Sequence, residues 1–74
     1  MVKILAVLPR SIAANAGIHG GDVLVSINQN EIRDVLDYRF YLTDTNVSLT
    51  LSRGGEPYTV HINKGEYDDI GLEF

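Results

Sequence analysis

The 74 residues include six basic and ten acidic side chains, for a formal charge of −4 at pH 7, and no cysteine. A chain this short has room for one small core, because it buries only about 60% of the surface that its unfolded form exposes. Without cysteine it forms no disulfide, thiolate zinc site or cysteine-ligated iron–sulphur cluster, and its few scattered basic residues argue against nucleic-acid binding.

The apolar run from Ile4 to Leu8 is shorter than the roughly 7–15 residues of a signal peptide, and no stretch approaches the ~20 apolar residues of a membrane span. We therefore expect a soluble, cytoplasmic domain that binds neither membranes nor nucleic acid and holds no metal or other cofactor.

The first third of the chain predicts a strand and a short helix. Residues 2–7 read as one strand that ends at Pro9, which cannot donate to a ladder. Ser11 is a candidate N-cap for the strong helix formers at 12–16, and Gly17 is the expected residue of positive φ that stops the helix.

The middle of the chain predicts a buried strand and a second helix. The β-branched run 23–27 lies between turns at 20–22 and 28–30. A helix is expected over 34–42, where Asp34 is the cap and Asp37 stands in for the glutamate of a capping box.

The helix expected over 34–42 carries two apolar stripes. Leu36 and Phe40 stand one turn apart and form the first stripe, while Val35, Tyr38 and Leu42 form the second. One stripe can face the core and the other a partner, although burial of both is an alternative.

The last third predicts an antiparallel hairpin and an acidic tail. Residues 47–52 and 58–63 alternate apolar and polar, and the glycine-containing segment 53–56 joins them. After residue 63 the chain is polar and then becomes apolar at 70–74. Its four acids are interpreted as a solvated segment, because no metal-ligand spacing connects them: Glu66, Asp68, Asp69 and Glu73.

Two runs carry a resemblance to a known family. Residues 7–18, Val-Leu-Pro-Arg-Ser-Ile-Ala-Ala-Asn-Ala-Gly-Ile, and residues 21–28, Gly-Asp-Val-Leu-Val-Ser-Ile-Asn, resemble a PDZ domain. Arg10 stands where the family usually has glycine, and Ile12 where proline is common. The resemblance implies a mainly β fold with two helices, a small PDZ-like, partly open antiparallel β-barrel or sandwich.

The closing Gly71-Leu72-Glu73-Phe74 looks like the Gly-Leu-Gly-Phe carboxylate-binding loop of PDZ domains, placed at the C-terminal end. This implies a circularly permuted element order. The sequence at 32–40 and this ending are also similar to the N-terminal PDZ-like domain of a group of bacterial radical-SAM iron–sulphur oxidoreductases of uncharacterised role. The resemblance therefore implies that residues 1–74 are one non-catalytic domain of a larger protein.

The resemblance also implies a peptide-binding groove. Its loop would be Gly71, Leu72, Glu73 and Phe74, and its helix wall Val35, Tyr38, Arg39 and Leu42, although these four helix residues can equally be core or plain surface. Glu73 places a negative charge where a carboxylate would approach, so we expect weak or no binding of free peptides and docking onto the parent chain.

Two other roles stay open for the expected groove. A free-standing module that binds peptide C-termini is the alternative function. Self-association, with Phe74 of one copy in the groove of another, is a second hypothesis.

An enzyme is the least supported interpretation. His19 and His61, with the serines, match no nucleophile, metal-binding or phosphate-loop spacing. Both histidines are expected to be solvated, and the four tyrosines to serve packing, because no basic stripe accompanies them.

Overall fold

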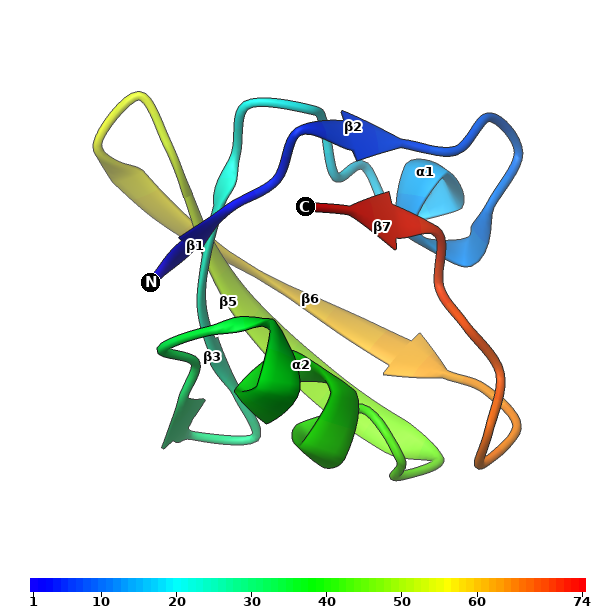
Figure 1. Cartoon of the computed structure of the whole chain (residues 1–74). Helices are drawn as coiled ribbons and strands as arrows, with labels where there is room; N and C mark the ends of the chain where they lie inside the picture. The colour runs from blue at the N-terminus through cyan, green and yellow to red at the C-terminus, as the bar shows by residue number, and fades with distance from the viewer.

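The computed structural model describes residues 1–74 and is mainly β with two helices, as predicted (Figure 1). The elements follow in the order β1 (Val2–Lys3), β2 (Ala6–Val7), α1 (Ile12–Asn15), β3 (Val23–Ile27), β4 (Asn30–Glu31), α2 (Val35–Tyr41), β5 (Asn46–Arg53), β6 (Glu56–Asn63) and β7 (Leu72–Glu73).

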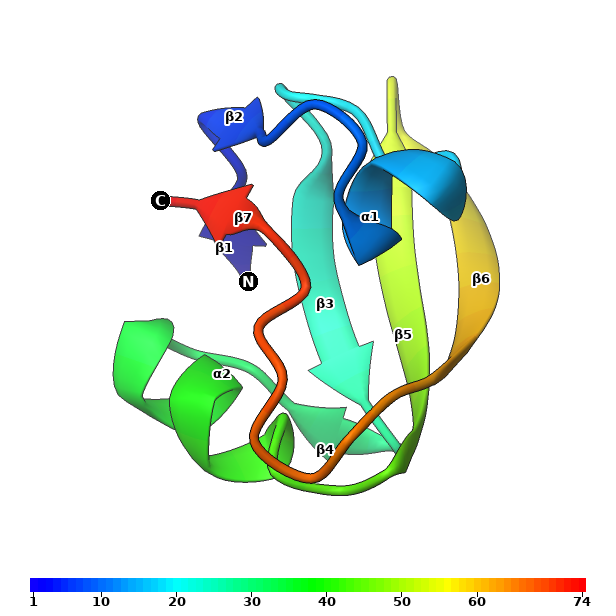
Figure 2. The same cartoon turned by 90° about the vertical axis from the view of Figure 1, so that its right-hand side faces the viewer.

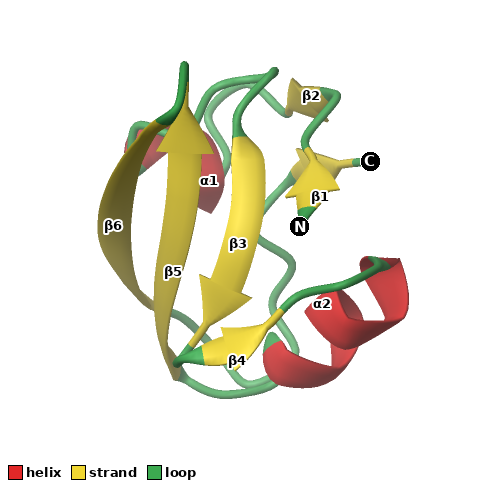
Figure 3. Ribbon diagram, turned by 90° about the vertical axis from the view of Figure 1, so that its left-hand side faces the viewer, coloured by secondary structure: helices red, strands yellow, loops and turns green.

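Two antiparallel sheets form the β part of the molecule, and they do not close into a barrel. The larger sheet has the order β1-β3-β5-β6, with β4 beside β3, and the smaller one is the pair β2-β7. In Figure 2, α2 lies below the β2–β7 pair and α1 lies beside it, with β3, β5 and β6 behind them. Figure 3 shows the opposite side, where β6, β5 and β3 face the viewer.

The prediction of one strand over residues 2–7 is wrong. Val2 and Lys3 pair with β3 in the larger sheet, whereas Ala6 and Val7 pair with β7 in the smaller one. Between them Ile4 is fully buried, and its backbone N–H and C=O bond to Asp22 and Gly21. These bonds turn the chain out of one sheet and into the other.

The predicted helix caps are confirmed. The Ser11 Oγ accepts a hydrogen bond from the Ala14 N–H at 3.1 Å, and the Asp34 Oδ1 accepts one from the Asp37 N–H at 2.9 Å. The reciprocal bond of the expected capping box is shifted by one residue, because the Asp37 Oδ2 accepts from the Arg33 N–H at 3.0 Å. Gly17 follows α1 with a φ of +88°, as expected for the residue that ends a helix.

The predicted hairpin is also confirmed. Strands β5 and β6 pair along their whole length, and Gly54 and Gly55 form the two-residue turn with positive φ. Strand β3 is interrupted by a bulge between Leu24 and Ser26, so that Leu24 and Ile27 are the residues it buries. The core contains, among others, Ile4, Ala13, Ile18, Leu24, Ile27, Ile32, Leu49, Leu51 and Ile70.

Neither helix is long and apolar enough to cross a membrane.

Candidate functional site

A pocket lies between α2 and β7. Seven residues line it, four of them apolar or aromatic: Val35, Tyr38, Arg39, Asp69, Leu72, Glu73 and Phe74. We call this space the groove. One wall is a helix and the other is the strand that ends the chain, so residues far apart in the sequence meet here.

The groove brings together six of the eight residues that the sequence proposes for the site. They are Val35, Tyr38, Arg39, Leu72, Glu73 and Phe74. Leu42 lies outside the groove and lines an adjoining pocket, and Gly71 precedes the strand that forms the wall. Leu72 and Glu73 belong to strand β7, so half of the expected loop over 71–74 is a strand.

Strand β7 has one edge that faces away from its partner strand. The Gly71 carbonyl accepts from the Leu8 N–H at 2.9 Å, and the Glu73 carbonyl accepts from the Leu5 N–H at 2.8 Å. Because successive residues of a strand direct their backbone groups to opposite edges, the N–H and C=O of Leu72 point away from β2. This edge borders the groove, since β7 lies between β2 and α2 (Figure 2).

Tyr38 forms the floor of the groove. Its side chain is 4% exposed, and its ring meets the Phe74 ring edge-on with centroids 4.8 Å apart. The Tyr38 hydroxyl is buried and has no hydrogen-bond partner. Burial, and secondarily the nearby Asp69 carboxylate, raise the pKa of Tyr38, so the hydroxyl stays protonated.

The two stripes of α2 have different surroundings. Tyr38 and Leu42 are buried and Val35 is half-buried, whereas Leu36 and Phe40 are 76% and 70% exposed. The structure thus selects the interpretation in which one stripe faces inward and the other faces solvent. The Phe40 ring contacts the ring of Tyr41 edge-on at 5.0 Å.

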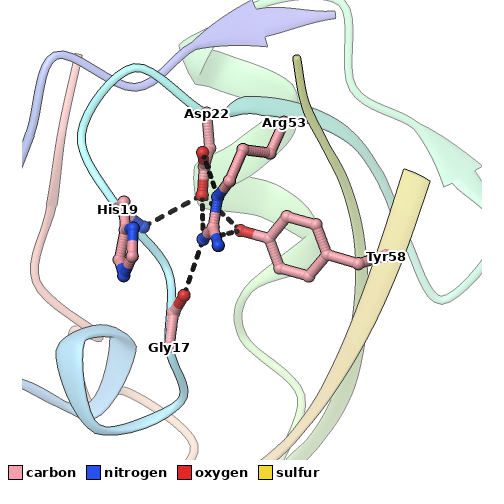
Figure 4. Close-up of polar contacts among 5 residues, drawn as sticks. All are labelled: Gly17, His19, Asp22, Arg53 and Tyr58. Carbon is pink, nitrogen blue, oxygen red and sulfur yellow. Dashed lines mark hydrogen bonds and ion pairs between the residues drawn. The ribbon is translucent and has the colours of Figure 1, made fainter. Parts of the chain in front are cut away.

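A buried carboxylate holds the turn before β3 (Figure 4). Asp22 is 3% exposed, and its two oxygens accept from the Arg53 Nε and Nη2 at 2.9 and 2.8 Å. The Tyr58 hydroxyl and the His19 N–H also donate to it, and the Arg53 Nη2 donates to the Gly17 carbonyl at 2.8 Å. The Arg53 guanidinium is the main reason that the pKa of Asp22 lies below its usual range.

Sequence reasoning did not connect these residues, because Asp22 is 31 positions from Arg53 and 36 from Tyr58. The network fixes the turn and lies outside the groove. His19 and His61 are exposed, as predicted, and the Nδ1 of His61 lies 2.7 Å from the Ser48 Oγ.

Comparison with known families supports the PDZ resemblance. The family model of the PDZ domain matches residues 3–53, which include both helices and strands β3 and β5. A search of curated proteins gives no match.

Proposed function

Because the chain belongs to the PDZ domain family, whose members are in general protein-interaction modules, we propose that it binds an extended protein segment in the groove between α2 and β7. The observation that carries this proposal is the unpaired edge of β7. There the N–H and C=O of Leu72 are directed into a groove whose other wall is a helix.

The mode of binding would be strand addition. An extended segment would pair with the free edge of β7, and its backbone bonds would supply affinity for any sequence. The side chains that point into the groove would meet Val35, Tyr38 and Phe74, which would set the preference. PDZ domains are in general not enzymes, and we propose no catalytic role for this one.

The charges of the groove favour an internal segment over a free C-terminus. Asp69 and Glu73 line it together with Arg39, so a carboxylate that entered would face a net charge of −1. In addition, the Gly71 N–H already donates to the Asp69 Oδ1 at 3.3 Å. The chain thereby supplies its own anion to one amide of the segment that would otherwise receive a ligand carboxylate.

The proposed partner is the remainder of a larger parent chain. The resemblance of residues 32–40 and 71–74 to radical-SAM-associated PDZ-like domains supports this. In this proposal the domain is a circularly permuted docking module of a bacterial oxidoreductase. A free-standing module that binds other proteins is the alternative.

Titration of the ¹⁵N-labelled domain with peptides would test the proposal. We expect capped internal peptides to shift the amide signals of β7 and α2, and amidation of a C-terminal peptide to leave its affinity unchanged. If free C-terminal peptides bind with micromolar affinity and amidation of their terminus abolishes that binding, the preference for internal segments is contradicted. Shifts confined to other elements would contradict the groove itself.

Two adjacent helix residues give a matched pair of variants. Val35 lines the groove, whereas Leu36 faces solvent. We expect Val35→Ala to weaken peptide binding by about threefold to tenfold, since it removes apolar contact area, and Leu36→Ala to leave binding unchanged. Equal losses for both variants would show that peptides do not enter the groove.

A further inference from the structure

A second pocket adjoins the groove and shares part of its lining. It lies between α2 and the segment that precedes β7, and its volume is about 210 Å³. We call it the acidic pocket. Its lining residues are Tyr38, Arg39, Leu42, Thr43, Glu66, Tyr67, Asp68 and Asp69, of which Tyr38, Arg39 and Asp69 also line the groove. A side chain of a segment bound in the groove can therefore reach the acidic pocket.

The acidic pocket carries an excess of negative charge that the chain leaves uncompensated. Three carboxylates and one guanidinium line it, which gives a net charge of −2. None of the three carboxylates forms a salt bridge, because the two salt bridges of the molecule are Arg33–Asp37 and Arg53–Asp22. The nearby Lys64 ammonium donates to backbone carbonyls of residues 65 and 66.

Independent of this charge, a buried polar group of the same wall lacks a partner. The Tyr38 hydroxyl is inaccessible to water and makes no hydrogen bond. A buried hydroxyl without a partner is costly to the folded protein, and a ligand that supplies the missing bond recovers that cost on binding. The phenol oxygen can accept from a cationic N–H donor.

These observations together specify the chemistry of a partner, and we propose that the acidic pocket receives an arginine side chain of the segment docked in the groove. This inference rests on the proposed function. The guanidinium would donate to the carboxylates of Asp69 and Glu66, and its flat face would lie against the Tyr67 ring. Because the Tyr38 hydroxyl is closed to solvent, the pocket would widen on binding to let the guanidinium donate to it as well.

Arginine suits this pocket better than lysine. Its five N–H donors in a plane can serve several acceptors at once, and its weakly hydrated plane stacks on aromatic rings. Tyr67 is 85% exposed and lines the pocket, so its ring is available for such a contact. Arg39 contributes the one opposing charge and lowers the attraction without reversing it.

Capped heptapeptides of alternating threonine and valine provide the probe, with arginine, citrulline, lysine or glutamate as the central residue. Citrulline is nearly isosteric with arginine but neutral. We expect the arginine peptide to bind about tenfold more tightly than the citrulline peptide in low salt, with lysine between them and glutamate weakest. This advantage is expected to shrink as the ionic strength rises.

Two variants localise the effect. Asp69→Asn keeps the oxygen that accepts from the Gly71 N–H but removes the charge, and it is expected to weaken the arginine peptide by about threefold to tenfold. Tyr38→Phe is expected to raise the Tm, because it removes the orphaned hydroxyl. It is also expected to weaken the arginine peptide several-fold and the citrulline peptide less, because the neutral ureido N–H groups of citrulline are weaker donors to the same oxygen. Glu56→Gln, in the distant β5–β6 hairpin, is the matched control for lost charge and is expected to change nothing.

The outcomes separate the two proposals. Equal binding of all four peptides, with shifts at α2 and β7, would overturn the arginine site and leave the groove intact. An arginine advantage that Asp69→Asn and Tyr38→Phe leave unchanged would also overturn the site. No binding of any peptide, or shifts only at other elements, would overturn both the site and the proposed function.

Discussion

Arg10 occupies a backbone conformation that usually belongs to glycine. Its φ is +62°, and the turn that it forms connects β2 to the N-cap of α1. A side chain in this region costs about 1–2 kcal/mol, because Cβ approaches the following carbonyl oxygen. The glycine that PDZ-like sequences usually place here is thus explained by the turn and needs no role in binding.

Arg10→Gly is expected to stabilise the domain by up to about 1 kcal/mol, since the relief of strain exceeds the greater entropy of glycine in the unfolded chain. Urea denaturation measures the change. Arg10→Ala, which removes the same side chain but keeps Cβ, is the control and is expected to give no gain. A gain of similar size from alanine would show that the charge, and not the backbone, was responsible.

Gly71 is required by both its conformation and its surroundings. Its φ is +94°, and an added Cβ would overlap the Ser11 side chain, which caps α1. We expect Gly71→Ala to destabilise the domain by roughly 2–4 kcal/mol, measured by thermal or urea unfolding. Gly21→Ala isolates the strain, because Gly21 has a φ of +93° and open space around it. Equal losses for the two variants would contradict the overlap with Ser11.

At the scale of elements, the sequence predicted those whose signal is local. Both helices have a side-chain cap, and the β5–β6 hairpin has strict alternation around two glycines. The two-residue strands could not be predicted in this way. β4 and β7 were not predicted, and β1 and β2 were merged, because so short a strand has no periodicity and is defined only by the partner that the fold brings beside it.

The cap of α2 is the element-scale feature most easily tested. Asp34→Ala removes the acceptor for the Asp37 N–H and is expected to cost about 1 kcal/mol. In a domain of this size that lowers the Tm by about 4–8 °C, which calorimetry can measure. Asp44→Ala removes an acid beyond the other end of α2, where no cap bond is lost, and should not lower the Tm. A loss equal to that of Asp34→Ala would contradict the cap as the cause.

At the scale of the whole molecule, contacts between side chains far apart in the sequence could not be predicted from the sequence alone. The groove residues were proposed through the PDZ resemblance, and six of them meet because α2 and β7 lie side by side. The Asp22 network and the orphaned Tyr38 hydroxyl were not anticipated. Each depends on side chains that approach only after the sheets have formed, and neither has a sequence spacing of its own.

The Asp22 network predicts how stability depends on pH. The pKa of Asp22 is lowered in the folded state, so its contribution is present above the ordinary value of 3.8 and is lost as the pH falls toward the folded value. Burial and Asp22 raise the pKa of Tyr58 to about 12, so its contribution is lost as the pH rises above the ordinary value of 10. We expect a plateau between these limits.

Urea midpoints measured across pH test this prediction. Asp22→Asn should lower the free energy of unfolding at neutral pH by about 2 kcal/mol, because charge-assisted bonds to a buried group are lost. The same variant should lose less stability than the original protein as the pH falls below 3.8. Tyr58→Phe should reduce the loss of stability above pH 10 in part, because the pKa of Tyr38 is also raised in the folded state and its contribution remains. If the loss of stability at acid pH persists unchanged in Asp22→Asn, other carboxylates are responsible for that loss.

The division of residues 2–7 between two sheets has a consequence for dynamics. β2 and β7 pair over two residues, while β5 and β6 pair over eight, so the strand that borders the groove belongs to the smaller cooperative unit. Its amides should exchange with deuterium far sooner than those of the hairpin. A bound segment that added a third strand to this pair would slow exchange at β7 and β2 first, before any change reached β5. The proposed binding edge would then also be the place where the folded domain opens first, and a partner would act by closing it.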